Sequence, residues 1–585
     1  MPEYLAPGVY VEETSFRAKS IEGVGTSTTA FVGLTRRGPI GGVPELVTSL
    51  PDFERIYGGL DNLSLTGSTD QLNYLAHAAR AYFDNGGSRL YVMRVHAGAT
   101  NASGSIRTNA DATEGVTVNA RFPGAAYNGR FTLRETLRPA TSIRAANAAP
   151  FGSVLRITTG TGAAATSTLN VKRATGWFNS ADTAVTLTEG MDAQLVTLSA
   201  EFTDADGYTQ VWDELGFAGA HPRFIGTVLA ATPTNRGDAL QNSVSVTVGT
   251  NVSAFELQTD IAALTAVAGD TEGRRQLVLT GGTDGAAPTT AGSETTAGTH
   301  AEALAVLSGV EDISIVAAPG SSAYSASAQA VHNALISHAE RRRAYRIAVL
   351  DSPPSLTPGG ARDVRGRLDS KYAALYYPWV VVSNPLARPG RDDIPREIAL
   401  PPSGFVCGIY ARNDVQRGVH KAPANEIVRG ALRFELEVNF AQQEMLNPLG
   451  VNCLRFLSGR GNRVWGARLI SSDPEWKYVS YRRYFNYLEA SIDRSTQWAV
   501  FELNGERLWA NIRETIAGFL YNEWRSGALL GTSPEEAFFV RCDRSTMTQN
   551  DLDNGRLICL IGVAIIKPAE FVIFRIGQKT ADARE

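Results

Sequence analysis

The sequence predicts a multidomain protein of mixed α/β and α+β class. We expect a discontinuous α/β core domain, an inserted β-rich outer region and a short arm at each end of the chain. Three observations lead to this prediction. Strand and helix patterns alternate on both sides of a long stretch with few helix signals. That stretch, 98–300, is rich in Ala, Thr, Gly and Ser. Short apolar strand patterns also lie close to both termini.

The overall composition is that of a folded protein with several domains. The chain has 585 residues, of which 43% are hydrophobic and 19% charged, with a formal net charge of −4. At roughly 100–200 residues per domain, this length predicts about three to five domains. The small net charge gives no basic field for nucleic acid, and no apolar run approaches the ~18 residues of a membrane span. We therefore expect neither nucleic-acid binding nor direct membrane insertion.

The four cysteines indicate neither a metal site nor a disulfide framework. They lie far apart, without a C-x-x-C pair, whereas zinc ligands are closely spaced and disulfide-built domains have a much higher cysteine density. The first ten residues, MPEYLAPGVY, lack the basic start and apolar stretch of a signal peptide. We expect synthesis in a reducing cytoplasm, without a signal peptide.

The α/β domain is predicted from two separated runs of strands and helices. In the first run, 29–34 and 89–95 have strand patterns, and 70–83 has a helix pattern that Asp70 can cap. In the second run the order is strand, helix, strand, helix, strand, over 312–317, 325–343, 345–351, 362–368 and 379–382. This alternation predicts a mostly parallel sheet covered by helices. We assign 21–97 together with 301–390 to this domain.

The inserted region is predicted to form one or two β-rich outer domains. Within 98–300, strand patterns at 115–120, 130–134 and 243–249 alternate with turns, and 285–299 is a low-complexity loop.

The last stretch, 391–585, is predicted to form a C-terminal core domain. Its segments 427–440 and 509–526 have helix patterns, and 556–566 has a strand pattern.

Each end of the chain carries a short strand pattern. Residues 1–20 are assigned to an N-terminal arm because Pro7–Gly8 interrupts any helix. At the other end, the strand pattern spans 570–577. The candidate strand residues are Val9, Tyr10, Val11 and Glu12 in the first arm, and Phe571, Val572, Ile573 and Phe574 in the second. Strand exchange with a neighbouring subunit and pairing within the same subunit would both satisfy their backbone groups, and the residues alone do not favour either.

The sequence lacks the motifs of common enzymes. The turn after Ala318 contains no G-x-G-x-x-G, and the chain has no phosphate loop, no H-E-x-x-H and no nucleophile elbow. His338 fits a core position, Asp351 fits a turn or cap, and the loop 459–466 fits a role in positioning Trp465. We predict no catalytic, cofactor-binding or metal site, and we expect that the protein is not an enzyme.

Many stretches of the chain resemble the contractile tail sheath family of phages, R-type bacteriocins and related contractile injection systems. In chain order they are PGVYVEE, TAFVGLTRRGP, AYFDNGGSRLYVMRV, GGTDG, YYPWVVV, PPSGFVCGIYARND, GVHKAPANE, NPLGVNCLRFLSGRGNRVWGARL, WKYVSYRRYFNYLEASI, EAFFVRCD and PAEFVIFRI. Their number and order make the resemblance specific. It covers roughly 1–97 and 301–585, while 98–280 matches weakly. Cys407 and His420 stand where the family pattern has a small residue and a large aromatic residue.

The resemblance implies a structural subunit of a phage tail or a tail-like particle, made in the bacterial cytoplasm. Such subunits polymerise as a helical homo-oligomer of hexameric rings around an inner tail tube protein, and they contract to drive the tube through a target envelope. Further partners implied are baseplate and terminal cap proteins. The resemblance also favours exchange of the arm strands between subunits.

The helix expected at 509–526 is the candidate to face the inner tube. Arg513 and Arg525 would then contact an acidic tube surface, and a buried structural helix is the alternative. For the whole chain, the alternative functions are another phage structural protein, an adhesin, or an α/β enzyme with a β-rich accessory domain.

Overall fold

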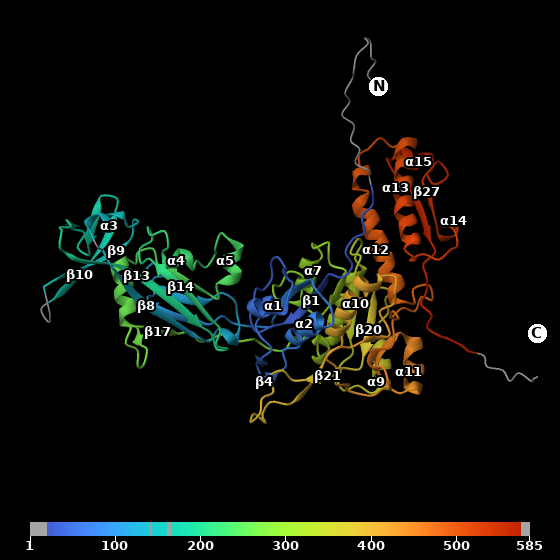
Figure 1. Ribbon diagram of the computed structural model, residues 1–585, viewed down its shortest axis with the longest axis horizontal. Coiled ribbons are helices and arrows are strands. Elements are labelled where there is room, and N and C mark those ends of the chain that lie inside the picture. The colour runs from blue at the N-terminus through green and yellow to red at the C-terminus, as the bar shows by residue number, and fades with distance from the viewer. Residues whose placement is uncertain (1–19, 141, 161–164, 575–585) are drawn as a thin grey trace, which may run out of the picture.

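The computed structural model describes residues 20–140, 142–160 and 165–574 (Figure 1). The molecule is elongated. A β-rich lobe lies at one end, an α/β body in the middle, and a lobe built on two long helices at the other end (Figure 1). None of the helices in these ranges is long and apolar enough to cross a membrane.

A nine-stranded sheet forms the centre of the body. Its spatial order is β2-β5-β1-β18-β19-β20-β25-β26-β23, and the six strands from β5 to β25 run parallel to one another. The strands are β1 (Thr29–Leu34), β2 (Glu45–Val47), β5 (Leu90–Val95), β18 (Ile315–Ala317), β19 (Ile347–Asp351), β20 (Ala373–Tyr377), β23 (Glu426–Ile427), β25 (Val451–Leu457) and β26 (Gly461–Val464). The sheet therefore combines segments from distant parts of the chain. Because β23, β25 and β26 belong to it, the predicted boundary at 390 does not separate two sheets.

Helices cover both faces of this sheet because alternate side chains of each strand point to opposite sides. In β1, Phe31 packs into one core, while Ala30 and Val32 pack into the other. The first face carries α1 (Leu50–Tyr57), α2 (Tyr74–Asp84) and α10 (Ser403–Arg417). The second carries α7 (His300–Leu307), α8 (Ala328–Glu340), α9 (Pro358–Arg365) and α11 (Phe440–Leu446). The predicted parallel, helix-covered sheet is thus confirmed.

Two predictions in the body are shifted along the chain. Residue 70 lies in β4 (Ser68–Gln71), which pairs with β3 (Leu63–Leu65), so it does not cap a helix. The side chain of Asn73 instead accepts a hydrogen bond from the backbone N–H of Ala76 and caps α2. The strand predicted at 379–382 is β21 (Val380–Ser383), which leaves the central sheet after Pro378 and pairs with β22 (Glu397–Leu400) and β24 (Arg433–Phe434). The central strand at this point is β20.

The helix predicted at 427–440 is wrong. The segment contains the last residue of β23 and all of β24, and α11 begins only at Phe440, after the cap residue Asn439. From Leu432 onward, apolar residues alternate with polar ones, and Phe434 and Val438 are buried. A period of two is typical of a strand.

The β-rich lobe contains a nine-stranded antiparallel sheet and a three-stranded one. The spatial orders are β12-β11-β10-β9-β13-β8-β17-β16, with β14 paired to β13, and β15-β7-β6. The strands are β6 (Ser103–Arg107), β7 (Val116–Ala120), β8 (Arg130–Pro139), β9 (Val154–Thr159), β10 (Thr166–Arg173), β11 (Gly176–Asn179), β12 (Ala184–Val185), β13 (Asp192–Thr203), β14 (Thr209–Leu215), β15 (Val244–Val248), β16 (Thr265–Ala266) and β17 (Arg275–Val278). The strands predicted near 115–120, 130–134 and 243–249 are confirmed as β7, β8 and β15. The lobe's helices are α3 (Ile143–Ala148), α4 (Ile225–Val228), α5 (Arg236–Gln241) and α6 (Ala254–Ala263).

Two arginines of the body join it to this lobe. A guanidinium nitrogen of Arg37 lies 2.7 Å from a carboxylate oxygen of Asp204, and these side chains are only 8% and 1% exposed. Arg36 donates to Asp206, with 3.0 Å between Nε and Oδ2.

The C-terminal lobe is built on α12 (Val479–Ser495) and α13 (Glu506–Arg525), as Figure 1 shows. A two-stranded antiparallel ribbon of β27 (Phe538–Arg541) and β28 (Leu560–Val563) packs beside them, with α14 (Pro534–Ala537) and α15 (Gln549–Asp553). The helix predicted at 509–526 is confirmed as α13. The strand predicted at 556–566 is shorter than expected: it comprises β28, followed by an isolated bridge between Ile565 and Leu529.

Candidate assembly sites

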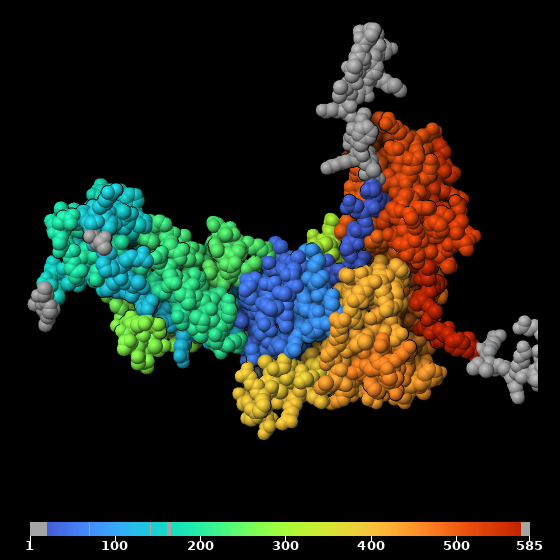
Figure 2. Space-filling view, in the orientation of Figure 1, coloured from blue at the N-terminus to red at the C-terminus, as the bar shows by residue number. Residues whose placement is uncertain are grey.

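The segment that leads to the N-terminal arm lies across helix α12. Figure 2 shows this segment, in dark blue, against the orange C-terminal lobe. The backbone N–H of Val24 donates to Ser491 Oγ at 3.1 Å. Gly23 packs closely on this helix, because a Cβ there would lie 2.3 Å from the hydroxyl oxygen of Tyr487 and the tyrosine side chain would have to move. These contacts fix the chain up to residue 20, and the predicted strand residues Val9–Glu12 lie outside the described residues.

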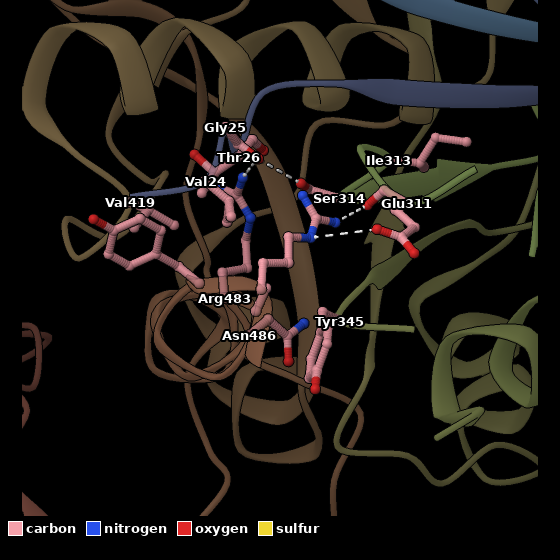
Figure 3. A pocket seen from close by; sticks show the side chains of 13 residues that line it. Val24, Gly25, Thr26, Glu311, Ile313, Ser314, Tyr345, Val419, Arg483 and Asn486 are labelled. Carbon is pink, nitrogen blue, oxygen red and sulfur yellow. Dashed lines mark hydrogen bonds and ion pairs between the residues drawn. The ribbon is translucent and has the colours of Figure 1, made fainter. Parts of the chain in front are cut away.

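A buried ion pair holds the same segment, and Figure 3 shows one of its members, Arg483, beside Thr26. Arg483 donates to both carboxylate oxygens of Asp414, at 2.8 and 2.6 Å, and these two side chains are 3% and 4% exposed. Thr26 joins the pair twice: its hydroxyl donates to Asp414 at 2.6 Å, and its carbonyl accepts from Arg483 at 3.0 Å. Burial raises the pKa of Asp414, and the guanidinium of Arg483 opposes that shift. We call Thr26, Asp414 and Arg483 the N-terminal anchor.

A second ion pair holds the segment that leads to the C-terminus. Glu570 accepts hydrogen bonds from Arg468 Nε and Nη2 at 2.7 and 2.6 Å, from Asn447 Nδ2 at 2.8 Å and from the Tyr478 hydroxyl at 3.1 Å. Burial would raise the pKa of Glu570, but the bonds from Arg468 and Asn447 outweigh it and hold that pKa below its usual value. Glu570 with these three donors forms what we call the C-terminal anchor.

The four residues after this anchor project into solvent. Phe571, Val572, Ile573 and Phe574 are 70%, 68%, 79% and 83% exposed. The strand predicted at 570–577 is not formed in its described part, because 570–574 have no strand partner among the described residues. Four consecutive exposed apolar side chains are unusual on a lone soluble protein and typical of an interaction segment.

The β27–β28 ribbon offers two open edges. Within the described residues its strands pair only with each other, from Phe538 opposite Val563 to Arg541 opposite Leu560. Phe539 and Leu560 are each about half exposed. An isolated two-stranded ribbon is marginally stable, and its edges carry unpaired N–H and C=O groups.

The two arginines proposed to face the inner tube lie on different sides of α13. One side of this helix is buried and therefore has a structural role; it is formed by Leu508, Ile512, Ile516 and Leu520. Arg525 is exposed, in line with the polar residues Arg507, Asn511, Glu514 and Asn522. Arg513 is half-buried, and its Nη1 lies 3.5 Å from the carbonyl oxygen of Cys542.

The polar residues considered for catalysis have structural partners. Asp351 is 3% exposed and accepts hydrogen bonds from the backbone N–H and the hydroxyl of Ser403, both at 2.6 Å. It therefore connects the end of β19 to the start of α10, and burial raises its pKa to about 7. His338 is a buried residue of α8 beside Arg346.

Ligands of open α/β sheets bind where the strand order reverses, which here is between β1 and β18. Tyr74, Pro288 and Tyr324 line that position and leave a cavity of only about 10 Å³, at the limit of what holds one water molecule. Within the described ranges, no three His, Cys, Asp or Glu residues are grouped to hold a metal ion.

Sequence reasoning missed both anchors. Their members are as far apart as Thr26 and Arg483, so no local pattern links them. The available signal was charge among aromatic residues, as in YRRYFNY around Arg483.

The family comparisons match two adjacent parts of the chain. Residues 293–468 match the phage tail sheath protein central domain, and residues 471–579 match the phage tail sheath C-terminal domain. A prophage major tail sheath protein of Pseudomonas aeruginosa is 26% identical over 268 residues, which are 45% of this chain and 64% of that protein. The tail sheath protein of Enterobacteria phage T4 is 23% identical over 185 residues, which are 31% of this chain and 26% of that protein. The matches thus span less than two thirds of either relative.

Solved structures show the same fold over nearly the whole chain. The PVC sheath complex of an extracellular contractile injection system, in its contracted state, has a TM-score of 0.52 at 20% identity and covers 99% of both chains. The helical sheath of the anti-feeding prophage, also contracted, has a TM-score of 0.52 at 20% identity and covers 98% of this chain and all of that one. With this shared fold, the two matched sheath domains support assignment of residues 293–468 and 471–579 to the contractile tail sheath family.

Proposed function

We propose that the chain is a structural, non-enzymatic subunit of a contractile sheath. Copies assemble helically, in hexameric rings, around an inner tube, and the sheath shortens to drive that tube through a target envelope. The observation that carries the proposal is that ion-pair anchors hold the two segments that lead to the chain ends, and that exposed apolar residues follow the second anchor. Such ends are built to bind something outside their own subunit.

The arms act by strand exchange. Each ribbon has two open edges, and each subunit has two arms, so one arm from each of two neighbours would complete a four-stranded sheet. Val9–Glu12 supply one strand and Phe571–Phe574 the other. Backbone hydrogen bonds then give the affinity, as in other cases of β-augmentation. A head-to-tail contact that does not close on itself generates a helix.

Contraction requires two packings of the same subunits. Arms held at fixed anchors let neighbouring bodies rotate without separating. The extended packing is held kinetically, and the contracted one has the lower free energy. No nucleotide is needed for firing. Support comes from the solved relatives, which include a sheath complex and a helical sheath, both in the contracted state.

The remaining partners are an inner tail tube protein, a baseplate and a terminal cap. One solved structure with this fold belongs to the anti-feeding prophage baseplate. The exposed side of α13, with Arg525 at its end, is the surface proposed to meet an acidic tube, with Arg513 at its flank. The subunit would be made in the bacterial cytoplasm and become part of a phage tail or tail-like particle.

Deletion of residues 1–15 tests this function directly. The truncated chain is expected to remain folded, because the N-terminal anchor is intact, but to form no tubes under conditions in which the full chain does. Negative-stain electron microscopy measures tube formation, and circular dichroism reports the fold. Full-length tubes from a folded truncated chain would contradict strand exchange.

A further inference from the structure

Cys542 and Cys559 lie opposite each other at one end of the ribbon. The last paired positions of β27 and β28 are Arg541 and Leu560, so continuation of this antiparallel register by one residue brings the two cysteines together. Their thiols also interact. Burial raises the pKa of Cys559 most, the neighbouring thiol of Cys542 adds to this shift, and together they bring that pKa to about 12.

The hydrogen-bond pattern of the ribbon shows which kind of cross-strand pair this is. The N–H of Ala564 donates to the carbonyl of Ala537 at 2.8 Å, so these two residues form a hydrogen-bonded pair. Such pairs alternate with non-hydrogen-bonded pairs along an antiparallel ladder. Counting along the ladder, Arg541 and Leu560 form a hydrogen-bonded pair, and the two cysteines form a non-hydrogen-bonded one.

A non-hydrogen-bonded pair has the geometry that a disulfide needs. Its Cα atoms lie about 4.5 Å apart and its side chains point to the same face, and disulfides span Cα distances of roughly 4.4–6.8 Å. Both cysteines belong to the core beneath α13, where Cys542 is fully buried and Cys559 is partly exposed. The partial exposure of Cys559 gives an oxidant access to the pair.

We propose that Cys542 and Cys559 are an oxidation site that forms an intrachain disulfide and thereby locks the two strands of the ribbon. The thiolate of Cys559 attacks a small disulfide such as oxidised glutathione, which forms a mixed disulfide and releases one glutathione thiolate. The thiolate of Cys542 then attacks the sulfur of Cys559 and releases the second. Two protons leave the protein, and the oxidised glutathione takes up the two electrons.

The other two cysteines are excluded from this chemistry. Cys407 and Cys453 are both fully buried, on opposite faces of the central sheet. Oxidation is therefore specific to one pair. It is also slow, because burial raises the pKa of both reacting thiols and leaves little thiolate near neutral pH.

The link to assembly rests on the proposed function. If neighbouring arms pair with the edges of the ribbon, a bond between its two strands prevents them from separating when the arms pull. The pair would stay reduced in the cytoplasm, where free thiols are maintained, and would oxidise after the particle leaves it.

Thiol counting on the full chain tests the chemistry without any variant. The protein, purified with reductant, is incubated with oxidised glutathione for times on the order of hours to a day, then denatured and titrated for free thiols. The count is expected to fall from four to two, and peptide mapping should find Cys542 joined to Cys559. Four remaining thiols at pH 9, or a bond that involves Cys407 or Cys453, would overturn the proposal.

Tubes test the link to assembly separately. Oxidised tubes are expected to survive higher denaturant concentrations than reduced ones, and a Cys542→Ser/Cys559→Ser variant should show no difference between the two conditions. If the disulfide forms but tube stability is unchanged, the ribbon lock is refuted while the oxidation site stands. If the disulfide forms but the chain that lacks residues 1–15 still polymerises, the proposed strand exchange is refuted and the oxidation site again stands.

Discussion

Replacement of Glu570 by glutamine is expected to loosen the C-terminal segment without unfolding the body. The carboxylate accepts four hydrogen bonds, two of them from Arg468, whose side chain is 7% exposed. A glutamine keeps one acceptor oxygen and turns an NH2 group toward the other donors. One bond from Arg468 and one bond from a neutral donor are lost, which amounts to about 2–3 kcal/mol. At ~1.4 kcal/mol per factor of ten, the segment should open roughly 30–150 times more often.

Hydrogen exchange of the amides between 564 and 572 measures this opening. Lys477→Gln is the matched control, because Lys477 also faces Glu570 but at 3.8 Å and with 40% of its side chain exposed. A solvent-screened contact of this kind contributes about 0–1 kcal/mol. Unchanged exchange in Glu570→Gln, or an equal effect of both substitutions, would refute the assignment of Glu570 as an anchor.

Four further outcomes are expected. The pKa of Glu570 is lowered in the folded chain, so the stability that this carboxylate gives to the C-terminal segment is complete above the unfolded pKa of about 4.5 and is lost as the pH falls through the folded value. Acid should therefore release the segment in the wild type but not in Glu570→Gln, and hydrogen exchange at pH 3–6 measures this release. Thr26→Val removes a hydroxyl that donates to the Asp414 carboxylate at 2.6 Å and should cost about 1.5–3 kcal/mol at the N-terminal anchor, seen as faster exchange at 20–28; unaltered exchange would contradict that anchor. The pKa of Asp351 is raised to about 7 from 3.8, so the stability that this protonated carboxyl gives to the fold is complete below pH 3.8 and is lost as the pH rises to about 7. The urea midpoint of the wild type should fall over this range and that of Asp351→Asn should not, and identical pH profiles of the two proteins would refute the assignment. Arg525→Glu should weaken co-assembly with the tube protein in a sedimentation assay while tubes of the sheath alone still form, and unimpaired co-assembly would exclude this tube contact.

Local patterns in the sequence were sufficient to predict elements whose own apolar residues indicate a strand or a helix. The strands at 29–34 and 89–95 were predicted from short apolar runs, which prove to be buried on both faces of the sheet. The helix at 509–526 was predicted from apolar residues at a helical spacing. At 427–440, Gly430 and the short strands on either side hid a period of two. The segment after Glu570 is the most informative case, because its residues favour a strand but the described chain supplies no partner.

The anchors could not be predicted, because they depend on contacts between distant segments. Arg468 meets a carboxylate more than a hundred positions later in the chain, and Arg483 meets a threonine near its beginning. Taken alone, each of these residues is typical of a protein surface. Only folding around the central sheet and α12 brings the partners together and removes them from water.

The two anchors also determine which parts of the subunit would bear mechanical load. A pull on either arm passes through a guanidinium–carboxylate pair into α12 or, through the hydrogen bonds between Arg468 and Asn452, into β25 of the central sheet. The β-rich lobe lies at the opposite end of the molecule (Figure 1) and joins the body through its connecting strands and the Arg36 and Arg37 pairs. Force between neighbours would bypass this lobe. It is therefore the part of the subunit in which foreign sequences, such as affinity tags or display domains, can be inserted with the least effect on how the particle moves.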